Sequence, residues 1–170
     1  MRKIALLLLA TIFATSAFAQ QWSAGIRVGS GIQAVGQYRY NDKSYFEVRL
    51  GGSWNNEETI VDEFNTSRMN AELTIMHNWR LLDMDWTPDY GTWFVDAGVG
   101  INGGGRKYYG YGGVMGSARL GFTFFDVPLT VSVDWSPSFG IYNRYFAGQS
   151  KTDFNSLGIA NLGITCVYNF

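Results

Sequence analysis

The sequence has 170 residues, a length that favours one domain over two. Charged residues make up 16% and aromatic residues another 16%, with 21 Gly and only 3 Pro, which argues against disorder and against a helical bundle and favours strands. The net charge of -1 argues against a nucleic-acid partner, because such a partner requires a dense cationic face.

Residues 1–19 are predicted to be a secretory signal peptide, so that the mature chain starts at Gln20. Two basic residues precede an apolar run over residues 4–10, and Ala17-Phe18-Ala19 is a small-x-small cleavage site. Cys166 is the only cysteine, which excludes an internal disulfide framework. Past the signal no run approaches the ~18 apolar residues of a membrane helix, which excludes a helical membrane protein.

The rest of the chain alternates between apolar and polar residues with period two, broken by Gly, Asn, Asp and Pro clusters. Joints 41–44 and 125–128 are tight, whereas joints 55–68, 102–111 and 138–154 are long and polar. Short turns at one end and longer loops at the other are typical of a bacterial outer-membrane barrel; joints 29–31 and 82–91 depart from that rule. We expect eight antiparallel strands, over residues 22–28, 32–41, 45–54, 69–81, 92–101, 112–124, 129–137 and 155–170.

A soluble lipocalin-like barrel would show the same period with an apolar interior, so further features must decide which face is inside. The mature chain has lysine only at Lys43, Lys107 and Lys151, all in expected turns or loops, although a strand face in water normally carries some. Aromatic residues gather on the apolar face at one end of the expected strands, which is typical of an interfacial girdle. They are Trp22, Tyr38, Tyr40, Phe46, Trp79, Trp93, Phe122, Phe124, Tyr168 and Phe170. The apolar face is therefore expected to face lipid.

The C-terminal strand ends on Phe170, with Tyr168 two residues earlier. This ending resembles the C-terminal signal by which Gram-negative outer-membrane barrels are recognised for assembly, although the family pattern has Gly where this chain has Thr165. In length, strand number and segments such as Gly36-Gln37-Tyr38-Arg39-Tyr40, the mature chain resembles the small eight-stranded barrels of the outer-membrane protein X and protein A type. That superfamily includes adhesins, structural proteins and lipid-modifying enzymes, so the resemblance implies a location and a fold and leaves the activity open.

Charged residues occupy the alternate strand positions, between those of the apolar face, and are expected to point into the lumen. Because eight strands leave an interior only wide enough for side chains, these charges should pair with one another. They form either a conduction path or a closed salt-bridge plug, and their near-neutral balance favours the plug. They are Arg27, Arg39, Glu47, Arg49, Glu72, Arg80, Asp96, Arg119 and Asp134, together with the polar residues Gln33, Gln37, Asn70, Thr74, Asn78, Ser117 and Ser132.

Parity also predicts which inward residues lie opposite one another. A turn with three central residues, 42–44, would place Arg39 across from Glu47. A four-residue turn over 125–128 would place Arg119 across from Asp134. Pairing of the fifth and sixth strands about residues 107 and 108 would place Asp96 on the other side of Arg119, giving an acid, base, acid row.

Several motifs admit a functional interpretation. His77 is the only histidine; lipid A deacylases of the barrel superfamily need a His and Ser pair in the outer leaflet, whereas His77 is expected near the periplasmic end. Palmitoyltransferase barrels need an apolar pocket inside, which the charged lumen denies. The run from Gly98 to Gly103 matches G-x-G-x-x-G, but no helix follows, so these glycines are expected to relieve crowding in the barrel wall.

Three further stretches fall outside the expected strand cores. The loop from 55 to 67 carries four acids, Glu57, Glu58, Asp62 and Glu63, and is expected to be solvated, with a divalent cation as the alternative. The basic, aromatic loop 103–111 is expected to be exposed, with lipopolysaccharide or a surface glycan as a conceivable contact. Residues 85–91 and 134–140 share the pattern D-W-[ST]-P-x-[YF]-G, interpreted as a Trp-anchored turn.

From these features we expect a non-enzymatic barrel in the cell outer membrane, with a closed lumen and with loops that serve surface interaction or envelope integrity. The alternatives are a lipid A-modifying enzyme and a narrow pore for small solutes. We expect no catalytic residues, no cofactor and no metal site. The expected partners are outer-membrane lipid, lipopolysaccharide and the barrel assembly machinery, with no nucleic acid, and the chain is expected to be a monomer.

Overall fold

The computed structural model describes residues 21–54, 69–106, 109–146 and 149–170. None of these residues belongs to a helix long and apolar enough to cross a membrane. The described strands are β1 (Trp22–Gly29), β2 (Gly31–Asn41), β3 (Ser44–Ser53), β4 (Asn70–Met84), β5 (Gly91–Arg106), β6 (Tyr109–Phe124), β7 (Leu129–Trp135), β8 (Ser138–Phe146), β9 (Gln149–Gly158) and β10 (Leu162–Asn169).

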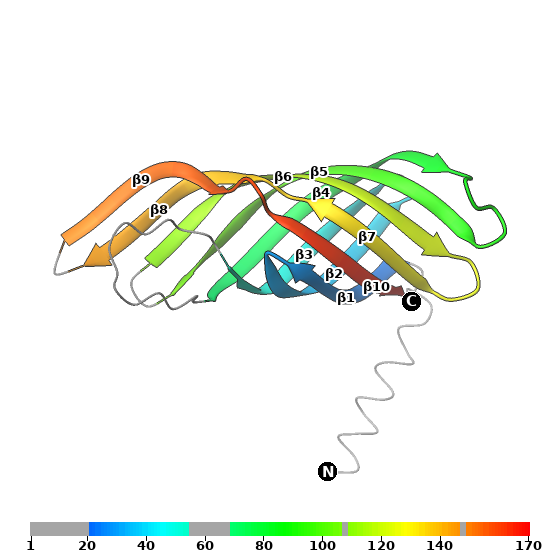
Figure 1. The fold of residues 1–170 in the computed structure, drawn as a ribbon, viewed down its shortest axis with the longest axis horizontal. Coiled ribbons are helices and arrows are strands. Elements are labelled where there is room, and N and C mark those ends of the chain that lie inside the picture. Colours follow the sequence, from blue (N-terminus) through cyan, green and yellow to red (C-terminus); the bar gives the residue numbers. More distant parts are fainter. Residues whose placement is uncertain (1–20, 55–68, 107–108, 147–148) are drawn as a thin grey trace, which may run out of the picture.

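Eight of these strands close into an antiparallel barrel. Strands β1 to β7 pair in chain order, β10 pairs with β7, and β10 pairs with β1 to complete the ring. Strand β8 continues β7 along β6 in the same register, and β9 pairs with β8. Figure 1 shows the β8–β9 hairpin (orange) extending past the ends of β1 and β2 (blue). The predicted fold, an eight-stranded antiparallel barrel, is confirmed.

The barrel has a turn end, which holds the β2–β3, β4–β5 and β6–β7 connections, and an opposite loop end (Figure 1). The four-residue turn over 125–128 is confirmed, since Thr123 pairs with Thr130. The three-residue turn over 42–44 is wrong: only two residues separate β2 from β3, and an irregularity between Arg39 and Asn41 shifts the register. Arg39 therefore lies opposite Tyr45.

Two of the expected loops are largely strand. Strand β5 runs on to Arg106 and β6 begins at Tyr109, while most of 138–154 belongs to β8 and β9. Glycine and polar residues in these stretches resemble strand breakers, but neighbouring strands supply partners for their backbone groups. Lys151 consequently lies in β9 and not in a loop, and the expected last strand over 155–170 is divided at residues 159–161. The predicted signal peptide, Lys107 and the four acids of the loop 55–67 lie outside the described residues.

The barrel is polar inside and apolar outside. Leu50 and Val114 on the outer wall are 62% and 63% exposed, whereas Glu47 and Arg49 inside are 0% and 1% exposed. Glycines in the wall make room for large inward side chains: a Cβ on Gly121 would lie 2.2 Å from the ring of Phe94. The core of this fold is therefore the filled lumen.

Aromatic side chains on the outer wall pack against one another around the turn end. Ring centroids lie 4.8 Å apart for Trp22 and Tyr38, and 5.0 Å apart for Trp93 and Phe122. Tyr40, Phe46, His77 and Trp79 form a further group across β2, β3 and β4. Tyr168 and Phe170 pack edge to face at 5.3 Å. These residues make one aromatic belt, named so below.

Candidate functional site: the luminal ion network

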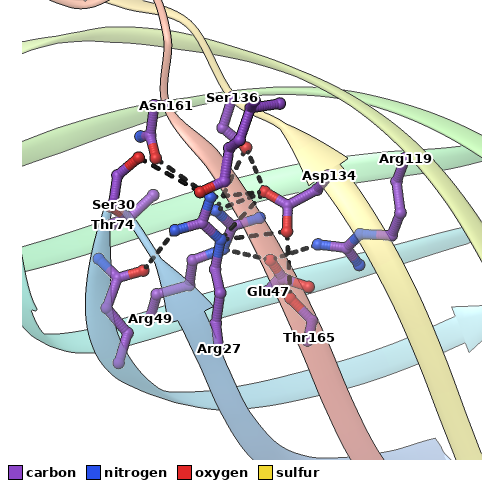
Figure 2. A network of polar contacts seen from close by, with 12 residues as sticks. Arg27, Ser30, Glu47, Arg49, Thr74, Arg119, Asp134, Ser136, Asn161 and Thr165 are labelled. Atoms are coloured by element: carbon purple, nitrogen blue, oxygen red, sulfur yellow. Dashed lines mark hydrogen bonds and ion pairs between the residues drawn. The ribbon is translucent and has the colours of Figure 1, made fainter.

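Five buried charged residues meet in the middle of the lumen, and we call them the luminal cluster: Arg27, Glu47, Arg49, Arg119 and Asp134. They come from β1, β3, β6 and β7, and each side chain is at most 2% exposed. Period-two alternation on each strand directs them inward together. Figure 2 shows these side chains pointing toward one another across the barrel.

Asp134 binds the Arg27 guanidinium through two nitrogens. The Nη2 of Arg27 lies 2.8 Å from Oδ1 of Asp134, and its Nε lies 3.0 and 3.1 Å from the two carboxylate oxygens. Ser136 and Thr165 donate their hydroxyls to the same carboxylate at 2.8 and 3.1 Å. The Nη1 of Arg49 lies 3.5 Å away from it. Paired and hydrogen-bonded in this way, a buried carboxylate can remain charged.

Glu47 is shared by two arginines. Its Oε1 accepts from Nε of Arg49 at 2.6 Å and from Nη2 of Arg119 at 2.8 Å, and its Oε2 accepts from the amide of Gln37 at 2.6 Å. The luminal cluster therefore contains three cations and two anions, and ion pairs link them in the order Arg27, Asp134, Arg49, Glu47 and Arg119.

Toward the turn end the network continues through a tyrosine. Arg119 donates to the hydroxyl of Tyr45 at 2.7 Å, and that hydroxyl donates to Asp96 at 2.8 Å. Arg80 is the last member of this row of contacts. Its Nε lies 2.8 Å from Asp96, and its guanidinium carbon lies 3.9 Å from the centroid of the Phe94 ring. In this part of the lumen the positive charge of Arg80 thus neutralises the negative charge of Asp96.

Toward the loop end, neutral hydrogen-bond donors replace the arginines around a buried carboxylate. Glu72 is 4% exposed and accepts from Gln33 at 2.8 Å, from Thr74 at 3.3 Å and from the hydroxyl of Tyr111 at 2.5 Å. Within the described residues Glu72 makes no ion pair, so neutral donors stabilise this carboxylate. Tyr111 packs with Tyr109 of β6 and with Tyr142 and Leu157 of the β8–β9 hairpin in an apolar cluster at the loop end. Loop 103–111 was expected to present exposed aromatics, but Tyr109 and Tyr111 are buried, which corrects that expectation.

The predicted register is correct across three strands, but the predicted ion partners are not. Asp96 lies opposite Arg119 and Arg119 lies opposite Asp134, as expected. The guanidinium of Arg119 nevertheless pairs with Glu47 across the lumen. Arginine side chains are long enough to cross a narrow interior, so the nearest strand neighbour need not be the partner.

Arg39 is the one predicted luminal charge that the structure places differently. Its side chain is exposed at the turn end, 6.0 Å from the ring of Tyr45, and Gln37 takes the predicted place opposite Glu47. Arg39 keeps the inward parity of Gln37, but it occupies the last inward position before the β2–β3 turn, and the irregularity that follows it makes Tyr45 its partner in place of Glu47. The other predicted luminal charges lie inside, as do the polar residues Gln33, Gln37, Asn70, Thr74, Asn78, Ser117 and Ser132, of which Gln37 is half-buried.

Other residues singled out in the sequence lie on the wall. The Nε2 of His77 is 2.5 Å from the hydroxyl of Tyr40, within the aromatic belt. Gly98 faces Asn78, whose Oδ1 would lie 2.1 Å from an added Cβ, so this glycine relieves crowding as expected. Of the two D-W-[ST]-P segments, residues 85–90 form the β4–β5 turn, whereas residues 136–137 interrupt the wall between β7 and β8.

Several members of the network were not predicted from the sequence: Tyr45, Tyr111, Ser136, Asn161 and Thr165. Tyr45, Tyr111 and Thr165 share the inward parity of their strands, so extending the alternation would have found them. Ser136 and Asn161 lie where strands are interrupted, where no period applies.

The arrangement neutralises charge and fills space. Among the described residues no group of three His, Cys, Asp or Glu side chains could hold a metal ion. Comparisons with protein-family models, with curated proteins and with solved structures find no match to this chain.

Proposed function

We propose that this chain is a non-enzymatic integral outer-membrane barrel whose lumen is closed by the ion network and whose loop end serves surface interaction or envelope integrity. The observation that carries the proposal is the reversed burial: arginines and carboxylates are fully buried while Leu, Ile and Val cover the outer wall. An exposed apolar wall of this extent is unfavourable in water and favourable in lipid.

The aromatic belt supports an orientation in the membrane. Trp and Tyr rings prefer the boundary between hydrocarbon and headgroups, and the belt surrounds the turn end. We infer that the turn end faces the periplasm and the loop end faces outward. Outer-membrane lipid and lipopolysaccharide are then the proposed lipid partners, and the chain acts as a monomer.

The filled lumen supports the closed state. Eight-stranded barrels have interiors that side chains can fill, and here the luminal cluster and Tyr45 cross the barrel with contacts of 2.6 to 2.8 Å. We expect the purified protein to give no steady single-channel openings in planar bilayers. Regular openings would refute the closed lumen and favour the pore.

Cell fractionation tests the location. We expect the protein in the outer-membrane fraction, with mobility on gels that changes on heating, and recovery as a soluble periplasmic protein would contradict the proposal. Incubation with labelled lipopolysaccharide should leave the lipid unmodified, and a modified product would favour the enzyme.

The proposed assembly signal has its own test. Phe170→Ala should slow insertion by the assembly machinery, whereas Phe124→Ala removes a ring that packs against Phe122 of the aromatic belt at the same end and should not. Equal insertion rates for the Phe170 variant and the unmodified chain would remove that role from the C-terminus.

A further inference from the structure

Residues 159–161 connect β9 to β10, and we call them the junction. The closed ring of strands ends at this point. On the turn-end side of the junction, β10 pairs with β1 as far as Gly29 opposite Gly163. On the loop-end side, β9 pairs with β8 and with no other described strand. Gly158 precedes the junction with a φ of 155°, which side chains rarely adopt. The junction therefore sets the direction in which the β8–β9 hairpin leaves the barrel.

Backbone and side-chain hydrogen bonds hold the junction to the ring. The indole of Trp135 donates to the carbonyl of Ile159 at 2.7 Å, and the backbone N–H of Ser136 donates to the carbonyl of Asn161 at 2.8 Å. The side-chain oxygen of Asn161 accepts from Nη2 of Arg27 at 3.1 Å. The junction is thus fastened to β7 and β1 at once.

Two of the residues that hold the junction, Arg27 and Ser136, bind one buried carboxylate. Oδ1 of Asp134 accepts from Nη2 of Arg27 and from the hydroxyl of Ser136, each at 2.8 Å. Figure 2 shows Asn161 above Arg27, with Asp134 and Ser136 beside it. Arg49 lies close to the same two residues, with Nη1 3.3 Å from the hydroxyl of Ser136. The luminal cluster consequently positions two of the three residues whose donors hold the junction, Arg27 and Ser136.

We propose that the luminal cluster is a clasp for the β8–β9 hairpin, so that the position of the hairpin and the arrangement of the cluster are thermodynamically coupled. Asn161 lies three residues after the end of β9, so moving the hairpin relative to the ring withdraws the Asn161 acceptor from Arg27 on β1 and changes the balance of donors around Asp134. Coupling is reciprocal: a change at the Arg27–Asp134 pair, to which Asn161 is bonded, alters the hairpin, and a partner that displaces the hairpin alters that pair. This inference concerns the folded barrel and does not depend on where the barrel resides.

Amide hydrogen exchange on the refolded barrel in detergent tests the clasp. Asn161→Ala removes the acceptor of Arg27 and leaves the backbone bonds of the junction in place. We expect exchange over residues 152–158 to accelerate about tenfold or more, because a hydrogen bond to a charged group is lost. Gln37→Ala is the matched control: it removes a hydrogen bond to the luminal cluster at Glu47, away from the junction, and should leave 152–158 unchanged.

A second variant at the same position should change the exchange rate in the opposite direction. Asn161→Asp places a carboxylate beside Arg27, which should tighten the clasp and slow exchange over 152–158 relative to the unmodified chain. If Asn161 has only a local structural role, both of its variants should accelerate exchange. That result would overturn the clasp, as would unchanged exchange in Asn161→Ala or equal acceleration in Gln37→Ala.

Discussion

Removing the carboxylate of Asp134 is the sharpest test of the ion network. Asp134 is 1% exposed and neutralises Arg27 through contacts of 2.8, 3.0 and 3.1 Å. Asp134→Ala leaves that cation buried without its partner, which costs about 3 to 5 kcal/mol of the free energy of unfolding. Because single domains are stable by about 5 to 15 kcal/mol, the loss is a large part of the total.

A compensating variant separates charge from packing. Arg27→Met together with Asp134→Ala restores the charge balance of the lumen, while Arg49 keeps Glu47 at 2.6 Å. We expect the double variant to be more stable than Asp134→Ala alone, because replacing both members of a buried pair costs less than stranding one. The measurement is urea unfolding of the barrel refolded into lipid vesicles, followed by tryptophan fluorescence. A double variant less stable than the single one would refute the reasoning.

A double-mutant cycle and a glycine substitution test how side chains fill the lumen. In a double-mutant cycle, Arg119 should couple more strongly to Glu47 than to Asp134, although Asp134 is its neighbour in strand register; equal coupling energies would contradict the observed pairing. Gly121→Ala should lower the free energy of unfolding by about 1 to 3 kcal/mol, because its Cβ would overlap a buried ring. Gly36→Ala, a wall glycine with nothing within 4 Å, is the control and should be close to neutral in the same urea titration.

The sequence by itself determined the architecture of this barrel. Apolar and polar residues alternate along each strand, and because side chains in a strand point to opposite faces, that alternation specifies which residues share a face. Arg119, Asp134 and Asp96 lie in the predicted row for this reason. Alternation does not specify the length of a turn, and the two-residue β2–β3 turn with its irregularity places Arg39 opposite Tyr45 and not opposite Glu47.

Only the tertiary structure decided the partners inside the lumen. Strand register fixes where a side chain starts, but the lumen is narrow enough for an arginine from β6 to reach Glu47 on β3, so the choice of partner depends on how all the side chains fill one shared volume. The β8–β9 hairpin was hidden for a related reason. Its polar, glycine-containing sequence resembles a loop, and it becomes strand because β6 offers an edge whose backbone groups it satisfies. Pairing between segments far apart in the chain, which no local pattern encodes, made both choices.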